Sequence, residues 1–234
     1  MRGAQRIVVL TGAGVSAESG VPTFRGPDGL WEGHRVEDVA TPGAFRRDPV
    51  LVQRFYDARR AALGRVEPNP AHRALARLDR EWPGEFLLVT QNVDDLHERA
   101  GAQRLIHMHG ALKSAWCQGC GHRCSWEGTL LDGPACPRCA LTGRLRPDIV
   151  WFGEMPYQMQ RIEAAIAGCD LFVSIGTSGN VYPAAGFVDL ARHGGADTLE
   201  LNLDASMTSH RFAQSRLGPA GALVPALVAQ LLGG

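Results

Sequence analysis

Short apolar runs alternate along the chain with longer segments in which apolar residues recur at helical spacing. Strand-like runs lie at residues 7–10, 86–90, 171–175 and 198–203, and each has the length of a buried strand. The helical patterns lie at about residues 49–63, 70–80, 157–168, 183–193 and 222–232. Apolar strands that alternate with helices predict an α/β fold with a parallel sheet.

Two stretches interrupt this alternation. Residues 31–70 consist of loop and helix, and residues 115–145 are rich in Cys, Gly and Pro. We predict that both are insertions that together form a small domain. The sheet domain then comprises residues 1–30, 71–114 and 146–234, which is a division that a chain of 234 residues can accommodate.

The first apolar run leads directly into a glycine-rich turn. Gly12, Gly14 and Ala17 have the G-x-G-x-x-A spacing of a dinucleotide-binding βα turn. Glycines let the backbone approach a pyrophosphate, and the helix that follows offers free N–H groups. Glycine-rich loops that bind nothing are also common, so the spacing alone leaves both interpretations open.

The segment after this turn argues against a dehydrogenase. A dehydrogenase would continue to a second strand that ends in an acidic residue. This chain instead has Gly or Pro at positions 26, 27 and 29, which makes a buried strand implausible. The nearby aromatic residues Phe24 and Trp31 argue against disorder. We therefore expect an ordered loop over a dinucleotide that does not serve hydride transfer.

Four cysteines have the spacing of a zinc site. Two Cys-x-x-Cys pairs complete a tetrahedral thiolate shell, and four protein ligands leave no open position, so the zinc should be structural. The predicted ligands are Cys117, Cys120, Cys136 and Cys139. Cys124 is a less favoured substitute ligand, and Cys169 is interpreted as a small buried hydrophobic residue.

The charge balance excludes several classes of protein. Lys and Arg number 24, as do Asp and Glu, so the chain has no electrostatic preference for nucleic acid or anionic membranes. No apolar run approaches the length of a membrane span, and the first strand begins too early for a signal peptide. Paired cysteines suit a reducing compartment. We expect a cytoplasmic monomer without nucleic-acid or membrane partners.

Six motifs follow one another along nearly the whole chain. They are residues 12–25 (GAGVSAESGVPTFR), residues 90–97 (TQNVDDLH), His109-Gly110, the four cysteines, residues 150–154 (VWFGE) and residues 176–178 (GTS). Together they resemble the sirtuins, the NAD-dependent protein lysine deacylases. The resemblance implies a Rossmann-like NAD-binding domain, a small zinc-binding domain and two cofactors, NAD and one structural zinc.

The resemblance also implies a reaction. The carbonyl oxygen of an acylated lysine attacks the ribose carbon that carries nicotinamide, and the products are nicotinamide, O-acyl-ADP-ribose and free lysine. His109 corresponds to the general base, and a near-neutral imidazole can take up a ribose hydroxyl proton. An NAD-dependent ADP-ribosyltransferase, which cleaves the same bond, is the alternative. A zinc-ribbon module for nucleic acid is disfavoured by the neutral charge.

Asn92 and Asp94 match the family's nicotinamide-ribose motif and join His109 as catalytic residues. From the residues alone, both also fit caps of the next helix. His107 and His97 are interpreted as structural. The resemblance places further cofactor contacts at Gly12, Ala13, Gly14, Ala17, Glu18, Thr23, Phe24, Arg25, Trp31, Gln91, Val93, Gly176, Thr177, Ser178, Asn202, Leu203, Asp204 and Ala220.

In the family the substrate peptide lies as an added strand between two segments, which correspond here to residues 150–154 and 179–183. The implied contacts are Val150, Phe152, Gly153, Glu154 and Val181. Trp151 and Phe152 also fit an ordinary hydrophobic core.

Tyr56 and Arg59 share a face of a predicted helix, since they lie at positions i and i+3. A solvated basic face is the alternative interpretation, because Arg54 and Arg60 flank them. Together with Ala40, which would leave width in an acyl channel, they resemble the bacterial class III sirtuins that accept succinyl- and malonyl-lysine. Members of that subgroup often accept acetyl-lysine too, so we expect a dual deacylase.

Overall fold

The computed structural model describes residues 3–23, 31 and 33–233. Its strands are β1 (Arg6–Thr11), β2 (Glu85–Thr90), β3 (Leu105–His107), β4 (Gly110–Cys117), β5 (Arg123–Ser125), β6 (Leu145–Ile149), β7 (Leu171–Ile175), β8 (Asp197–Asn202) and β9 (Gln214–Leu217). Its α-helices are α1 (Gly14–Ala17), α2 (Val36–Val39), α3 (Pro42–Arg47), α4 (Pro49–Ala62), α5 (Pro70–Glu81), α6 (Leu96–Arg99), α7 (Met159–Ala167), α8 (Phe187–His193) and α9 (Ala220–Leu231). Short 3-10 turns are η1 (Leu63–Arg65), η2 (Ala184–Gly186) and η3 (Ser209–Arg211).

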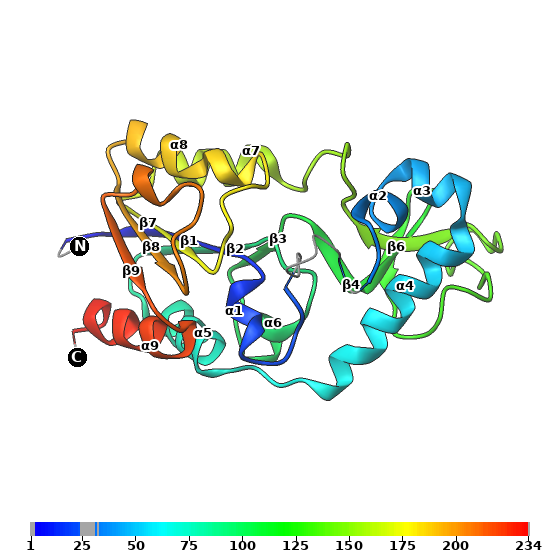
Figure 1. The fold of residues 1–234 in the computed structure, drawn as a ribbon, viewed down its shortest axis with the longest axis horizontal. Coiled ribbons are helices and arrows are strands. Elements are labelled where there is room, and N and C mark those ends of the chain that lie inside the picture. The colour runs from blue at the N-terminus through cyan, green and yellow to red at the C-terminus, as the bar shows by residue number, and fades with distance from the viewer. Residues whose placement is uncertain (1–2, 24–30, 32, 234) are drawn as a thin grey trace.

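Two sheets form the framework. A parallel six-stranded sheet has the order β3-β2-β1-β7-β8-β9, and a three-stranded antiparallel sheet has the order β5-β4-β6. The parallel sheet lies at the left of Figure 1 and the small sheet at the right, with α1 and α6 between them. The predicted α/β fold with a parallel sheet is confirmed.

The central strand β1 is buried on both faces. Ile7 and Val9 pack into one core, and Val8 and Leu10 pack into another on the opposite face. Figure 1 shows α5 and α9 along one face of the sheet and α7 and α8 along the other. Two covered faces explain why the strand is one continuous apolar run rather than an alternating pattern.

The predicted elements are present, with one change. Residues 183–193 were expected as one helix, but η2 precedes α8, so the first turn is a 3-10 turn. The structure adds strands that the apolar pattern did not predict, among them β3 and β9 at the two edges of the large sheet.

The small sheet extends beyond the predicted cysteine-rich insertion. β4 begins at Gly110 and β6 ends at Ile149, so both strands include residues that the predicted boundaries assigned to the sheet domain. The two strands pair with each other and flank the cysteine turns. Helices α2, α3 and α4 pack over this sheet in a core that contains Trp31, Tyr56 and Trp151.

The strand order places a topological switch point at β1. The chain fills positions on one side with β2 and β3 and on the other side with β7, β8 and β9. In open α/β sheets ligands bind outside the carboxyl ends of the strands at such a point. Among the residues that the structure describes, no helix is both long and apolar enough to span a membrane.

Candidate active site

Two glycine-rich turns meet at the switch point. The amide of Gly14 donates to the carbonyl of Gly176 at 2.9 Å, and the amide of Gly12 donates to the carbonyl of Ile175 at 3.0 Å. A Cβ on Gly14 would lie 2.7 Å from Cα of Gly176, whose own φ is +63°. The close backbone approach therefore requires glycine in both motifs.

A buried polar cluster lies beside this crossing. Ser16 Oγ donates to Asp94 Oδ2 at 3.0 Å, and Asn92 Nδ2 donates to Ser16 Oγ at 3.1 Å. Asp94 Oδ1 accepts from the amide of Leu96 at 3.1 Å. Burial raises the pKa of Asp94 despite these hydrogen bonds. The capping interpretation thus describes one oxygen of Asp94, whereas the Asn92 side chain reaches Ser16 instead of the helix.

Two histidines complete the cluster. His72 Nε2 lies 3.3 Å from Ser16 Oγ, and His97 Nε2 lies 3.0 Å from Thr11 Oγ1. Their ring centroids are 4.8 Å apart. Burial lowers the pKa of His72 to about 4 and the pKa of His97 well below its ordinary value. Both rings are therefore neutral near pH 7.

His109 and His107 differ in their ring contacts. His109 Nδ1 lies 3.2 Å from the carbonyl of Gln91, which can only accept, so Nδ1 carries the proton and Nε2 keeps its lone pair. Burial lowers the pKa of His109, and the Gln91 carbonyl only partly opposes this. In His107, Nδ1 contacts the carbonyl of Asn92 and Nε2 contacts Glu98 at 2.6 Å. His109 is the ring with a nitrogen suited to act as a base.

Sequence reasoning missed Ser16 and His72 as site residues. Ser16 lies inside the glycine-rich motif, but its hydroxyl has no distinctive spacing. His72 lies in the first turn of α5 and accepts from the amide of Asn69 in a capping box. That pattern predicts a helix start and gives no sign of a contact with Ser16.

Two of the predicted cofactor residues, Asn202 and Glu18, make hydrogen bonds that tie separate segments of the protein together. Asn202 Nδ2 donates to the carbonyl of Thr177 at 2.7 Å, which ties the end of β8 to the turn after β7. Glu18 Oε1 accepts from the amide of Gly221 at 2.8 Å, at the start of α9. The Glu18 carboxylate therefore stabilises the N-terminus of α9, next to the predicted contact Ala220.

The other predicted cofactor residues occupy several environments. A narrow pocket is lined in part by Gln91, Thr177, Gly179 and Val181, which brings two of the motifs together with the 179–183 segment. Val93 accepts from the amide of Leu112 through its carbonyl, and Trp31 is buried in the small-domain core. Ala13 and Ala17 lie in the first turn, Ser178 follows β7, and Thr23, Leu203 and Asp204 are exposed. Phe24 and Arg25 lie outside the described residues.

The predicted acyl-reading residues are buried. Tyr56 is 0% exposed and Arg59 is 7% exposed, so the interpretation as a solvated basic face is wrong. Trp151 Nε1 donates to Tyr56 Oη at 3.0 Å. The Arg59 guanidinium stacks 4.2 Å from the ring centroid of Trp31. These contacts place the two side chains in the aromatic core of the small domain.

The turn at residues 150–154 links His109 to the small domain. The amide of Val150 donates to the carbonyl of His109 at 2.9 Å, and the amide of Phe152 donates to the carbonyl of Ala40 at 3.0 Å. Trp151 is 2% exposed, as a core residue would be, but Phe152 is 43% exposed. Gly153, next in the turn, is exposed as well.

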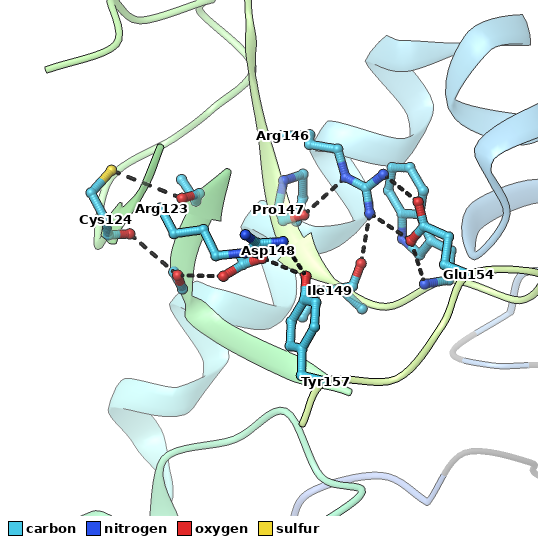
Figure 2. Close-up of polar contacts among 11 residues, drawn as sticks. Arg123, Cys124, Arg146, Pro147, Asp148, Ile149, Glu154 and Tyr157 are labelled. Atoms are coloured by element: carbon cyan, nitrogen blue, oxygen red, sulfur yellow. Dashed lines mark hydrogen bonds and ion pairs between the residues drawn. The ribbon is translucent and has the colours of Figure 1, made fainter. Parts of the chain in front are cut away.

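The Glu154 carboxylate forms an ion pair within the protein. It accepts two hydrogen bonds from Arg146, at 2.8 and 2.9 Å, and one from the amide of Trp151 (Figure 2). Although burial opposes it, the charge and hydrogen bonds of Arg146 hold the pKa of Glu154 below its usual range. The fold therefore holds the Glu154 carboxylate in place, and its side chain remains 25% exposed.

The four predicted zinc ligands form one cluster whose sulfur atoms lie within 4.8 Å of one another. The Cys117–Cys139 and Cys120–Cys136 Sγ distances are 3.8 and 3.7 Å. A tetrahedral site with Zn–S bonds of about 2.3 Å has sulfur atoms about 3.8 Å apart, so the arrangement fits zinc.

The two remaining cysteines lie outside this cluster. Cys124 Sγ contacts the carbonyl of Ala115 at 3.9 Å. Cys169 is buried against Ile166, and burial raises the pKa of its thiol to about 11. The substitute-ligand alternative for Cys124 has no support in this geometry.

Comparisons with known proteins agree with this geometry. The Sir2 family model matches residues 12–183. The NAD-dependent protein deacylase of Bdellovibrio bacteriovorus is 55% identical, covering 97% of each chain, and that of Escherichia coli K12 is 54% identical, covering 98% of this chain and 83% of the relative. A crystal structure of a Sir2 homologue–NAD complex is 39% identical with a TM-score of 0.89, covering 98% of this chain and 90% of that one. A Sir2 complex with a deacetylated p53 peptide and 3′-O-acetyl-ADP-ribose is 27% identical with a TM-score of 0.85, covering 97% and 94%. This chain belongs to the Sir2 family, the sirtuins.

Proposed function

We propose that this protein removes acyl groups from protein lysines in an NAD-dependent reaction that gives nicotinamide, O-acyl-ADP-ribose and free lysine. The observation that carries the proposal is His109, whose Nδ1 is held by the Gln91 carbonyl beside the switch point of the parallel sheet. Relatives that are 54–55% identical over nearly the whole chain are named NAD-dependent protein deacylases.

The residues at the strand ends suit a dinucleotide. The Gly12–Gly14 turn, the Gln91–Asp94 segment and the Gly176–Ser178 turn all lie outside the carboxyl ends of parallel strands. When bound, NAD supplies the ribose carbon that accepts the acyl oxygen and the ribose hydroxyls that take up the acyl group. Asn92 and Asp94, fixed by Ser16, hold the polar edge of this site.

In this proposal the protein orients its groups and transfers protons. His109 Nε2 takes the proton from a ribose hydroxyl, and the Gln91 carbonyl fixes the ring and stabilises its protonated form. The turn at residues 150–154 receives the substrate backbone, with residues 179–183 on its other side. The thiolates of Cys117, Cys120, Cys136 and Cys139 hold zinc for structure only, since all four positions are filled.

The direct test is mass spectrometry of the products formed from NAD with an acetyl-lysine or a succinyl-lysine peptide. O-acyl-ADP-ribose and free lysine are expected with both peptides. Transfer of ADP-ribose from NAD to protein, without an acyl-ADP-ribose product, would instead establish the transferase alternative.

We infer that Tyr56 and Arg59 select the acyl group and extend the substrate range to succinyl- and malonyl-lysine. Arg59 carries its charge in a buried aromatic core, where a terminal carboxylate would be a strong partner. Acetyl-lysine has no such carboxylate. Ala40, which is 4% exposed, adds little bulk beside them.

Arg59→Met should therefore lower kcat/KM for a succinyl peptide by about 10–150-fold, the range of one charge-assisted hydrogen bond. Deacetylation should fall far less, and Tyr56→Phe should give a smaller loss in the same direction. Arg54→Met, on the exposed face of α4, is the matched control. Equal losses for both acyl groups would assign Arg59 to the fold.

The cysteine pairs also bear on location. Zinc thiolates persist in a reducing environment, and we infer that the protein acts on acylated proteins in the cytoplasm.

A further inference from the structure

A partly buried ion pair lies in the small domain, where its guanidinium contacts two tryptophans. The side chain of Arg146 is only 2% exposed and makes a two-pronged contact with Glu154, Nη1 to Oε1 at 2.8 Å and Nη2 to Oε2 at 2.9 Å. Its guanidinium lies 3.5 Å from the ring centroid of Trp151 and 4.8 Å from that of Trp116. Figure 2 shows the pair at the turn that leaves β6.

Stability alone is a poor explanation for this pair. Desolvation of two charges offsets much of their attraction, and well-packed apolar residues often give equal or greater stability. What apolar residues cannot do is hold backbone groups. Arg146 Nη2 donates to the carbonyl of Ile149 at 2.6 Å, and Glu154 accepts from the amide of Trp151 at 2.9 Å. The pair therefore holds the backbone at Ile149, just before the 150–154 turn, and at Trp151, within it.

A second set of polar contacts joins the residues on either side of this turn, Asp148 and Tyr157. Tyr157 Oη donates to Asp148 Oδ1 at 2.8 Å, and Arg123 Nε contacts the same oxygen at 3.1 Å. The amide of Tyr157 donates to the carbonyl of Met108. Residues 148–157 therefore form a loop that is fastened twice, with the 150–154 turn inside it (Figure 2).

The fastened turn contacts the catalytic and acyl-reading residues at three points. Val150 binds the carbonyl of His109, Phe152 binds the carbonyl of Ala40, and Trp151 donates to Tyr56 Oη. The shape of this turn therefore sets where a peptide laid along it would meet His109. Among the residues that the structure describes, no hydrogen bond joins Arg146 or Glu154 to the glycine turns at the switch point.

We propose that Arg146 and Glu154 are positioning residues, which lock the 150–154 turn in the shape that binds the acyl-lysine peptide. This inference rests on the proposed deacylase function and adds that peptide binding and dinucleotide binding depend on separate sets of residues. The ion pair governs affinity for the peptide and acyl selection through Trp151 and Tyr56. It leaves the dinucleotide site at the ends of the parallel strands unaffected.

Glu154→Gln tests this division because it keeps the side-chain shape and an acceptor for Trp151 while removing the charge. Binding of a fluorescein-labelled succinyl-lysine peptide is measured by anisotropy, and binding of ADP-ribose by calorimetry. We expect the peptide Kd to rise by about 10-fold or more, the lower range for a hydrogen bond to a charged group. The ADP-ribose Kd should stay within about twofold, as for independent distant sites. In turnover, KM for the peptide should rise more than kcat falls.

Asp79→Asn is the matched control. Asp79 is also a carboxylate paired with an arginine, Arg104, at 2.6 Å, but it lies in the parallel-sheet domain. Asp79→Asn should lower Tm without changing peptide affinity. If Glu154→Gln behaves in the same way, with lowered Tm and native peptide Kd, the positioning role is overturned.

Tyr157→Phe keeps the test decisive if Glu154→Gln does not fold, since it removes one hydroxyl from the outer fastening. A smaller loss of peptide affinity is expected, and native affinity would overturn the proposal. Wild-type protein that binds the peptide but forms no acyl-ADP-ribose would overturn the deacylase function and leave the positioning role in place. Wild-type protein that binds no acylated peptide would overturn both.

Discussion

The clustered histidines differ in role because their ring nitrogens have different hydrogen-bond partners. His107 uses both ring nitrogens on the protein, and Glu98 together with the Asn92 carbonyl outweighs burial and raises its pKa. His97 is buried against Thr11 and stays neutral. His109 has one nitrogen fixed by a carbonyl, which leaves the other to act as a base.

This distinction predicts the pH dependence of the reaction. A general base acts in its neutral form, and burial lowers the pKa of His109 below its ordinary 6.5. On the acid side of the pH profile, the midpoint of the decrease in kcat/KM should therefore lie below pH 6.5. His109→Ala should lower turnover by about 10²–10⁴-fold, with ADP-ribose binding retained. A pH–rate profile and calorimetry check both expectations.

His193→Gln is the control for this experiment, because His193 is exposed on α8. It should leave the profile unchanged. Near-native turnover of His109→Ala would show that another group is the base.

Residues that lie in local motifs could be predicted from the sequence, whereas contacts between distant segments could not. The cysteine spacing led to the cluster that the structure forms. Ser16 and His72 lie far apart in the chain, and only the fold brings them within 3.3 Å. Glu154 was predicted to contact substrate, but its partner Arg146 lies in a strand that the pattern did not predict.

At the level of elements, a strand could be predicted from the sequence mainly where both of its faces are buried by apolar residues. β1, β2, β7 and β8 are central, and the first three form apolar runs, whereas β8 (DTLELN) alternates apolar with polar residues although its middle is buried. β9 has the sequence QSRL and lies at an edge, which leaves no apolar signal. β6 is buried throughout, yet it contains Arg146, Pro147 and Asp148. Its charges are paired within the fold, and no local pattern predicts such pairs.

The zinc module should depend on its metal. Its core holds few apolar side chains besides the cysteines, among them Leu130 and Leu145, so metal binding supplies much of the folding energy. Cys136→Ala should lose zinc and lower Tm, and wild-type protein should contain one zinc per chain by metal analysis.

Cys124→Ser is the control, since Cys124 lies nearby but outside the cluster. It should keep a full complement of zinc. Folded, active wild-type protein without bound zinc would contradict the structural role of the metal.

At the scale of the whole molecule, the site joins the two domains. The carbonyl of Val93 accepts from the amide of Leu112, and Lys113 Nζ lies 3.0 Å from Asp95 Oδ2, so β4 is tied to the segment that follows β2. The neutral rings of His72 and His97 lie with their centroids 4.8 Å apart and contact Ser16 and Thr11. The buried polar cluster therefore contains two histidines that burial keeps neutral near pH 7.

Acid should therefore destabilise the whole fold. An unfolded histidine takes up a proton near pH 6.5, whereas His72 in the folded state does so only near pH 4. The unfolded chain binds more protons in this window, so the free energy of unfolding decreases as pH falls from 6.5 towards 4. His72 alone should contribute a loss of about 2 kcal/mol at pH 5. His97 acts in the same direction, and the raised pKa of His107 acts against both.

Urea unfolding at pH 7 and pH 5 measures this effect, and His72→Gln isolates it. Glutamine at the third position of α5 can keep the capping box with Asn69, because its side-chain oxygen replaces Nδ1 as the acceptor. The variant loses the titrating ring, so the difference in unfolding free energy between the two pH values should shrink by about 2 kcal/mol. His193→Gln should not change that difference. An undiminished pH dependence in His72→Gln would show that the acid sensitivity arises elsewhere, and His72 would then have no part in it.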